Sequence, residues 1–164
     1  MDESPSAVNQ CCIIGEKQEA REKMQFRRFG NKYFVRMDRG EEILSALKSF
    51  CEAEKIKLAE VKALGAIDDF NVGLFDVEEK KYHTNHFTFP AEIVSLWGTV
   101  TTKDGQFYAH IHMSAGDKDG RVFGGHLNSA RVSATCEMTV DVSEGIIERK
   151  FSDEIGLNLI EFLN

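Results

Sequence analysis

The chain has 164 residues, of which 42% are hydrophobic and 29% charged, a balance typical of one globular domain with a hydrophobic core. Its 20 basic and 27 acidic residues give a formal net charge of −7. This charge argues against a broad DNA-binding surface, because such surfaces neutralise phosphates with Lys and Arg. No apolar run is long enough to cross a membrane, and the N-terminus lacks a secretory pattern, so we expect a cytoplasmic protein that does not bind membranes.

The four cysteines do not form a metal or redox motif. Cys11 and Cys12 are adjacent, Cys51 and Cys136 stand alone, and no Cys-x-x-Cys pair is present. Cys51 falls on a predicted helix and Cys136 in a predicted strand. Because free cysteine behaves as a small hydrophobic residue, we expect both thiols to be buried and unpaired.

The N-terminal part of the chain predicts a tail, a strand and a helix. Residues 1–24 are polar without a sustained period, which predicts a flexible tail before a domain of residues 25–164. Residues 26–37 are rich in aromatic and β-prone side chains and predict the first strand. Asp38 can cap a helix, with Glu41 at capping-box spacing, and the helix should end near Lys55. Apolar residues recur inside it at helical spacing: Ile43, Leu44, Leu47, Phe50 and Cys51.

The remainder of the chain predicts mostly strands, at 58–67, 70–77, 82–89, 93–101, 106–114, 131–142 and 146–151. Asp104-Gly105 predicts a tight hairpin turn, and Glu144-Gly145 predicts another that reverses the strand before it. The segment from Asp153 fits either a strand or a short helix. We therefore expect an α+β fold in which one long helix packs on a mainly antiparallel sheet.

A candidate metal centre lies in the strand after Asp104-Gly105. Alternation puts Tyr108, His110 and His112 on one face of the strand and apolar side chains on the other. Two residues apart on a strand, His110 and His112 can lean onto one ion. His126 follows Gly124-Gly125, where the backbone can turn and approach closely, and it can supply a third imidazole. Three neutral imidazoles suit zinc and leave one position for water or a ligand.

Simpler interpretations exist for each of these polar residues. Without His126, His110 and His112 would be better explained as polar residues on an exposed or interface face of the sheet, and the third histidine is what favours the metal centre. Asp117 to Gly120 resembles the start of a calcium loop, but its later ligands are missing, so we predict a turn. His83 and His86 lie three apart in a predicted strand, point to opposite faces, and fit structural or surface roles.

The chain resembles the PPC domain, the "plants and prokaryotes conserved" domain, over roughly residue 26 to the C-terminus. The segments that carry the resemblance are 89–99, 104–105, His110-Ile-His112 and 119–127, with support from 36–41, 135–137 and 156–157. The resemblance implies an α+β fold, assembly as a homotrimer, and zinc held by His110, His112 and His126. Prokaryotic members are often labelled predicted DNA-binding proteins, whereas plant members carry AT-hooks before the domain.

Departures from the plant pattern bear on partners. The Arg-Gly-Arg-Pro of an AT-hook is absent, because the only prolines are Pro5, after Ser4, and Pro90, after Phe89. We therefore expect weak DNA binding or none. The plant partner-contact segment Gly-Arg-Phe-Glu-Ile-Leu corresponds to 89–94, where Glu92 is retained but the Arg-Phe pair is not.

Three functions remain open from the sequence. The first is a zinc-stabilised trimeric module with a regulatory role, which meets a protein partner. The second is a zinc enzyme of the hydrolase or lyase type, or a small-ligand-binding protein, in which metal-bound water would need a general base. Glu92, Asp117 and Glu137 are the candidate bases, and Tyr108, Gly124 and Gly125 are further site-lining candidates. The third is a cupin, which the short distance between the histidine motifs and the absence of Pro-x-Gly disfavour.

Overall fold

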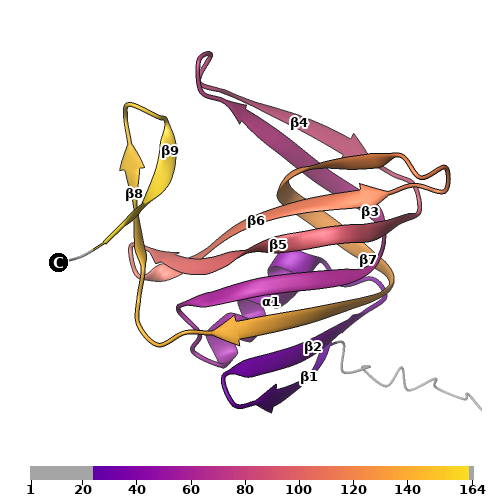
Figure 1. Cartoon of the computed structure of the whole chain (residues 1–164), viewed down its shortest axis with the longest axis horizontal. Helices are drawn as coiled ribbons and strands as arrows, with labels where there is room; N and C mark the ends of the chain where they lie inside the picture. The colour runs from indigo at the N-terminus through magenta and orange to yellow at the C-terminus, as the bar shows by residue number, and fades with distance from the viewer. Residues whose placement is uncertain (1–23, 163–164) are drawn as a thin grey trace, which may run out of the picture.

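The structure, a computed structural model, describes residues 24–162. The predicted tail therefore lies almost wholly outside the described residues, as do Cys11 and Cys12. Nine strands and one helix follow in chain order (Figure 1): β1 Met24–Phe29, β2 Lys32–Asp38, α1 Ile43–Ala53, β3 Ala59–Asp76, β4 Lys81–Phe87, β5 Ala91–Lys103, β6 Gln106–Gly116, β7 Val122–Val142, β8 Glu148–Ser152 and β9 Leu157–Glu161.

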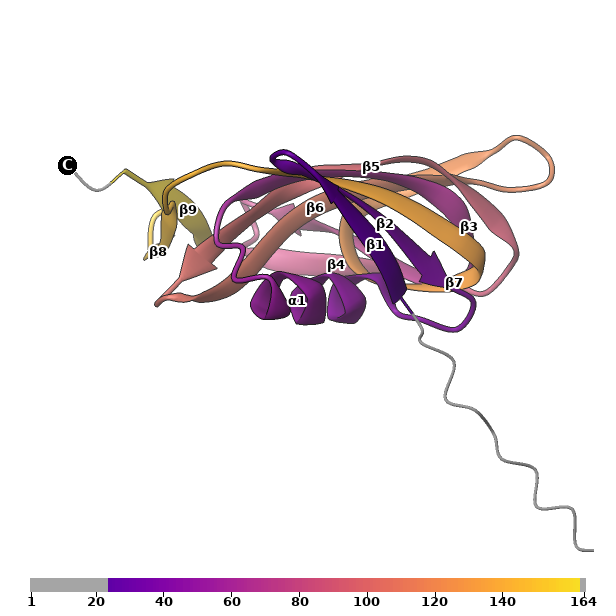
Figure 2. The same cartoon turned by 90° about the horizontal axis from the view of Figure 1, so that it is seen from below.

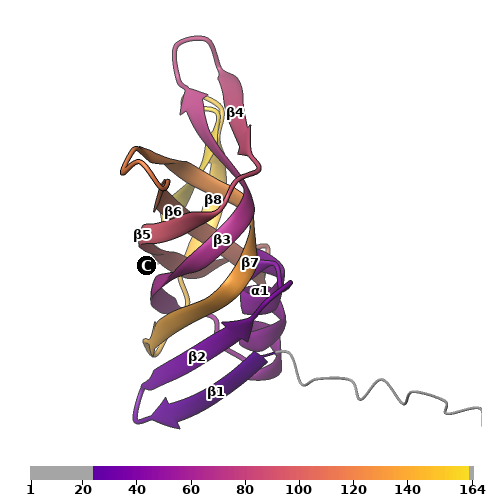
Figure 3. The same ribbon diagram turned by 90° about the vertical axis from the view of Figure 1, so that its right-hand side faces the viewer.

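All nine strands belong to one sheet, and all but one of its pairings are antiparallel. β3 pairs with β5 and β7, β5 pairs with β6, and β6 pairs with β7, so these four strands form a closed circuit of pairs. The β1–β2 hairpin extends the sheet beside β7, and β4 lengthens the other side through β3. The β1–β2 hairpin and the β3–β4 hairpin project at opposite ends of the molecule (Figure 3).

The helix covers one face of this sheet (Figure 2). Glu42 caps it, accepting hydrogen bonds from the backbone N–H of Leu44 and Ser45, and it also accepts one from Ala130 on β7 at 3.2 Å. Buried side chains of α1, including Leu47 and Phe50, join the strand side chains in a single core cluster. The expected α+β fold is confirmed, although the helix has only 11 residues and is short.

Two N-terminal predictions were wrong. Residues 26–37 form a hairpin, not one strand, because Gly30 adopts a positive φ of 62° and starts a two-residue turn between Phe29 and Lys32. Asp38 does not cap the helix, because it ends β2 and its carboxylate accepts a hydrogen bond from Arg36. The capping-box partner is partly kept, since Glu41 accepts from the Asp38 backbone N–H at 2.6 Å.

Three later boundaries also differ from the prediction. The two strands expected at 58–67 and 70–77 are one strand, β3. It continues through Asp68 and Asp69, where its pairing with β7 is irregular in register. β7 begins at Val122, nine residues before the predicted start at Arg131. The segment after Gly145 does not fold back on β7; β8 pairs with β9 and touches β5 at a single parallel bridge. The ambiguous tail is therefore a strand.

The expectation for two of the cysteines is confirmed. Cys51 and Cys136 are buried free thiols, and burial raises the pKa of each to about 12, so both stay protonated and unreactive at neutral pH. Within residues 24–162, no helix is long and apolar enough to span a bilayer.

Candidate metal centre

β6 presents two histidines on its outer face. Ile111 and Met113 are 1% and 2% exposed and face the core, so the alternating positions His110 and His112 must face outward. The predicted Asp104-Gly105 turn fixes this strand, since both residues have positive φ, at 53° and 73°, as a tight two-residue hairpin turn requires. The predicted alternation of the strand is confirmed.

The third histidine reaches the same face through strand pairing. His126 lies near the start of β7, directly opposite His112 on β6 and opposite Gly73 on β3. The glycine before it is required by close packing, because a Cβ on Gly125 would lie 2.6 Å from the Gly73 backbone oxygen. A Cβ on Gly124 would lie 2.7 Å from the Met113 backbone oxygen. The glycine pair therefore allows β7 to approach both neighbouring strands at the histidine.

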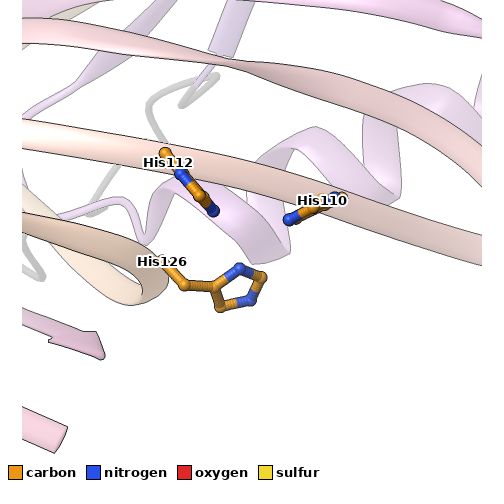
Figure 4. Close-up of side chains that lie close together, drawn as sticks. All are labelled: His110, His112 and His126. Carbon is orange, nitrogen blue, oxygen red and sulfur yellow. The ribbon is translucent and has the colours of Figure 1, made fainter. Parts of the chain in front are cut away.

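The three imidazoles point toward one another (Figure 4). One ring nitrogen from each of His110, His112 and His126 lies within 4.8 Å of the other two. Their ring centroids are 5.1, 5.4 and 5.7 Å apart. Nitrogens bound to one zinc ion at 2.0–2.1 Å are separated by about 3.3 Å in a tetrahedral arrangement. Small side-chain rotations would therefore be enough for this donor set to hold a metal ion.

Burial and neighbouring charge keep two of these rings neutral. Burial lowers the pKa of His110, and the nearby charge of Arg149 and then of His112 lowers it further. Burial also lowers the pKa of His126, with contributions from His110 and His112. A neutral imidazole offers the lone pair that a metal needs, so the lowered pKa of these two rings favours the form that could act as a ligand.

A buried cation borders the site. Arg149 on β8 is only 8% exposed, donates from Nε to Thr101 Oγ1 at 2.9 Å, and stacks with its Cζ 4.9 Å from the centre of the Tyr108 ring. Tyr108 lies two residues before His110 on the same face of β6. None of the ion pairs formed among residues 24–162 includes Arg149. Its positive charge therefore lies beside the Tyr108 ring without an ion-pair partner among the described residues, where it would favour a nearby anion.

The predicted carboxylates do not join the imidazoles. Asp117 is held in its own turn, where it accepts hydrogen bonds from the backbone of Asp119 and Arg121 and pairs with the Arg121 side chain at 2.8 Å. Glu92 pairs with Gly116, and it lies roughly 16 Å along β5 from the strand position opposite His112. Glu137 lies roughly 35 Å along β7 from His126. Within residues 24–162, the imidazole group contains no carboxylate.

Two aromatic residues that were not predicted as site residues flank the three imidazoles. Trp97 on β5 is the direct partner of His112, and its side chain is 54% exposed. Tyr82 on β4 lies on the other side, with its ring 6.4 Å from that of His126. A two-residue turn pairs Lys103 with Gln106, and counting back along both strands pairs Trp97 with His112. The predicted hairpin alone could have placed Trp97 beside the site.

The other two described histidines lie on β4. His83 and His86 are both exposed, as expected for surface roles. His86 contacts Asp69 at 2.9 Å, whereas His83 gathers with Asp76 and Glu79 near the β3–β4 turn. Each of the two groups has one partly buried member, Asp76 in the second and His126 in the first, but the second group offers a single imidazole beside two carboxylates.

The fold and the imidazole cluster together define a β-rich protein with a three-histidine candidate metal centre on its sheet. Residues 24–144 match the family model of the Plants and Prokaryotes Conserved (PCC) domain, which is the PPC domain. The chain belongs to this family. No curated protein matches the chain.

Three solved structures share the fold over nearly their whole length. A candidate DNA-binding protein from Bacteroides thetaiotaomicron is 30% identical, with a TM-score of 0.83, and the match covers 85% of this chain and 98% of that one. A metal-containing protein from Archaeoglobus fulgidus is 35% identical, with a TM-score of 0.76 and coverage of 84% and 99%. A PPC protein from Pyrococcus horikoshii is 34% identical, with a TM-score of 0.74 and coverage of 86% and 96%.

Proposed function

We propose that this chain is a zinc-binding PPC-domain module whose metal is held by His110, His112 and His126. The observation that carries the proposal is the convergence of three ring nitrogens from two strands to within 4.8 Å. Three imidazoles fit zinc better than magnesium or calcium, which prefer oxygen ligands. A relative from Archaeoglobus fulgidus is described as a metal-containing protein, which supports the presence of a metal. With three protein ligands, a fourth position stays available for water or a ligand.

The direct test is metal content after expression with zinc and dialysis. Wild-type protein should retain about one zinc per chain, and His110→Ala with His112→Ala should lower the content to near background in elemental analysis. His86→Ala is the matched control, because His86 is an exposed histidine outside both candidate metal groups. Full retention of zinc in the double variant would refute the ligand assignment.

The module works, in this proposal, as a homotrimer. Exposed apolar side chains support self-association: Phe26, Phe34 and Leu64 border a groove of about 570 Å³ between β1, β2 and β7. The C-terminal β8–β9 hairpin also exposes Phe151, Leu159 and Ile160. Light scattering should give three times the chain mass of 18.5 kDa. A monomer at micromolar concentration would refute the assembly but would leave the metal centre untouched.

Regulation through a protein partner fits the chain better than direct DNA contact. Relatives are described as candidate DNA-binding proteins, but this chain has a net charge of −7. DNA binding should therefore be weak, independent of sequence, and lost as salt rises. A gel shift that is sequence-selective and tolerates salt would overturn this part of the proposal.

A further inference from the structure

A hollow of about 350 Å³ opens beside the metal centre. His112 forms part of its wall, together with Ser95, Trp97, Met113, Ser114, Gly124 and Gly125. Its volume lies within the range of small-molecule sites, which is roughly 300–1,000 Å³. The hollow thus starts at a metal ligand and extends along the sheet away from His110.

Strand register explains why the surface is hollow there. Ser95 on β5 pairs with Ser114 on β6, and Ser114 pairs with Gly124 on β7. This row of small residues runs across three strands next to the row that contains Trp97, His112 and His126. Because adjacent rows on one face differ so much in side-chain size, the histidines and the indole stand above a low floor.

Trp97 forms a fixed wall of the hollow. Its indole Nε1 donates a hydrogen bond to Glu60 Oε1 at 2.8 Å, and Glu60 is in turn held by Lys62 at 2.6 Å. An indole that is 54% exposed yet fixed by a hydrogen bond loses little conformational entropy when a ligand packs against it. Trp97 is therefore a ready stacking surface directly across the strand pair from His112.

We propose that this hollow binds a small organic anion whose acidic head coordinates the metal and whose flat ring stacks on Trp97. The inference rests on the proposed metal centre and names the class of ligand for its open position. Arg149, whose guanidinium lies over the Tyr108 ring two residues before His110 and has no ion-pair partner among residues 24–162, favours an anionic head. The small floor gives room for a planar body, and the indole face supplies its contact.

Two hydroxamates that share a zinc-binding head test this class. Zinc-loaded protein is titrated by calorimetry with benzohydroxamate, which carries a ring, and with acetohydroxamate, which does not. Benzohydroxamate should bind about tenfold more tightly. In Trp97→Leu the two affinities should agree within about twofold, while zinc content and acetohydroxamate affinity stay at wild-type values, which shows that the variant is folded. Trp97 is the only tryptophan, so its fluorescence should also change with benzohydroxamate in wild-type protein.

Tyr82→Leu distinguishes the contribution of Tyr82 to ligand binding from that of Trp97. The preference for benzohydroxamate should survive this change, because Tyr82 lies beyond His126 and does not line the hollow. Loss of the preference in Tyr82→Leu but not in Trp97→Leu would overturn the inference, as would equal binding of both hydroxamates to wild-type protein. Failure of wild-type protein to retain zinc would instead overturn the metal centre itself.

Discussion

Removal of His126 should abolish the stabilisation that zinc gives to this fold. The metal would connect His110 and His112 on β6 to His126 on β7, two strands that pair over only five residue positions, from His112 opposite His126 to Gly116 opposite Val122. A bound ion would therefore add a cross-link at the open end of a short strand pair. His126→Ala removes the only ligand that β7 provides and leaves two ligands on one strand.

The expected size follows from binding linkage. An ion present at 100 times its dissociation constant stabilises the folded state by about 2.7 kcal/mol. For a domain of this length, each kcal/mol moves the melting temperature by roughly 2–4 °C. Wild-type protein should therefore melt roughly 5–11 °C higher with zinc than with a chelator. The His126 side chain makes no hydrogen bond among the described residues, so its loss should change the metal-free melting temperature by no more than about 2 °C.

Differential scanning calorimetry of four samples decides the question: wild type and His126→Ala, each with zinc and with a chelator. His86→Ala is the control and should keep the full zinc-dependent increase. An unchanged increase in His126→Ala would refute the three-histidine centre. An equal loss of stability in the metal-free state would show that His126 acts in packing, and that too would refute the reasoning.

Two other predictions concern pH and backbone packing. Burial lowers the pKa of His110 and His126 in the folded protein, so the unfolded chain takes up protons first as the pH falls. The free energy of unfolding of the metal-free protein, measured with urea, should therefore be full above about pH 6.5 and fall below it. Zinc affinity should fall over the same pH range. Stability that stays level from pH 7 to 5 would contradict this. Gly98→Ala should cost about 3 kcal/mol in urea unfolding and weaken zinc binding, because the added Cβ would lie 2.6 Å from Ile111 Cα and would also press on the His110 backbone oxygen. The matched Gly116→Ala, whose Cβ meets only a Val94 methyl at 3.3 Å, should cost less than about 1 kcal/mol, and equal costs for the two would contradict the packing argument.

The histidine pair could be predicted from sequence because its geometry is local. A two-residue turn sets where β6 begins, and strict alternation then decides which side chains face outward. His110 and His112 needed no knowledge of the rest of the fold. His126 was harder, because its place depends on β7 pairing with β6 at one register, and the Gly124-Gly125 pair was the only local sign of a close approach.

The errors arose where long-range contacts override local signals. The acidic pair Asp68-Asp69 looked like a break, but Asp68 pairs with Arg131 on β7 at 2.8 Å, and β3 continues through it. Gly124 and Gly125 fell outside every predicted strand, but both lie within β7, where the lack of a side chain allows the strands to approach closely. The Gly30-Asn31 turn was a readable hairpin signal that the aromatic run around it obscured.

The carboxylate candidates failed for a different reason, and that reason bears on function. Glu92, Asp117 and Glu137 were chosen by residue type near the motif in sequence, whereas the structure places Glu92 and Glu137 further along β5 and β7 and holds Asp117 in the turn after β6, away from the imidazoles. The neighbours that register does supply are Trp97, Tyr82 and, through Tyr108, Arg149: two aromatic rings and a cation. Proton transfer needs a basic group at the metal, whereas binding of a flat anion needs a ring and a positive charge. The side chains that surround the three histidines in residues 24–162 meet the second requirement.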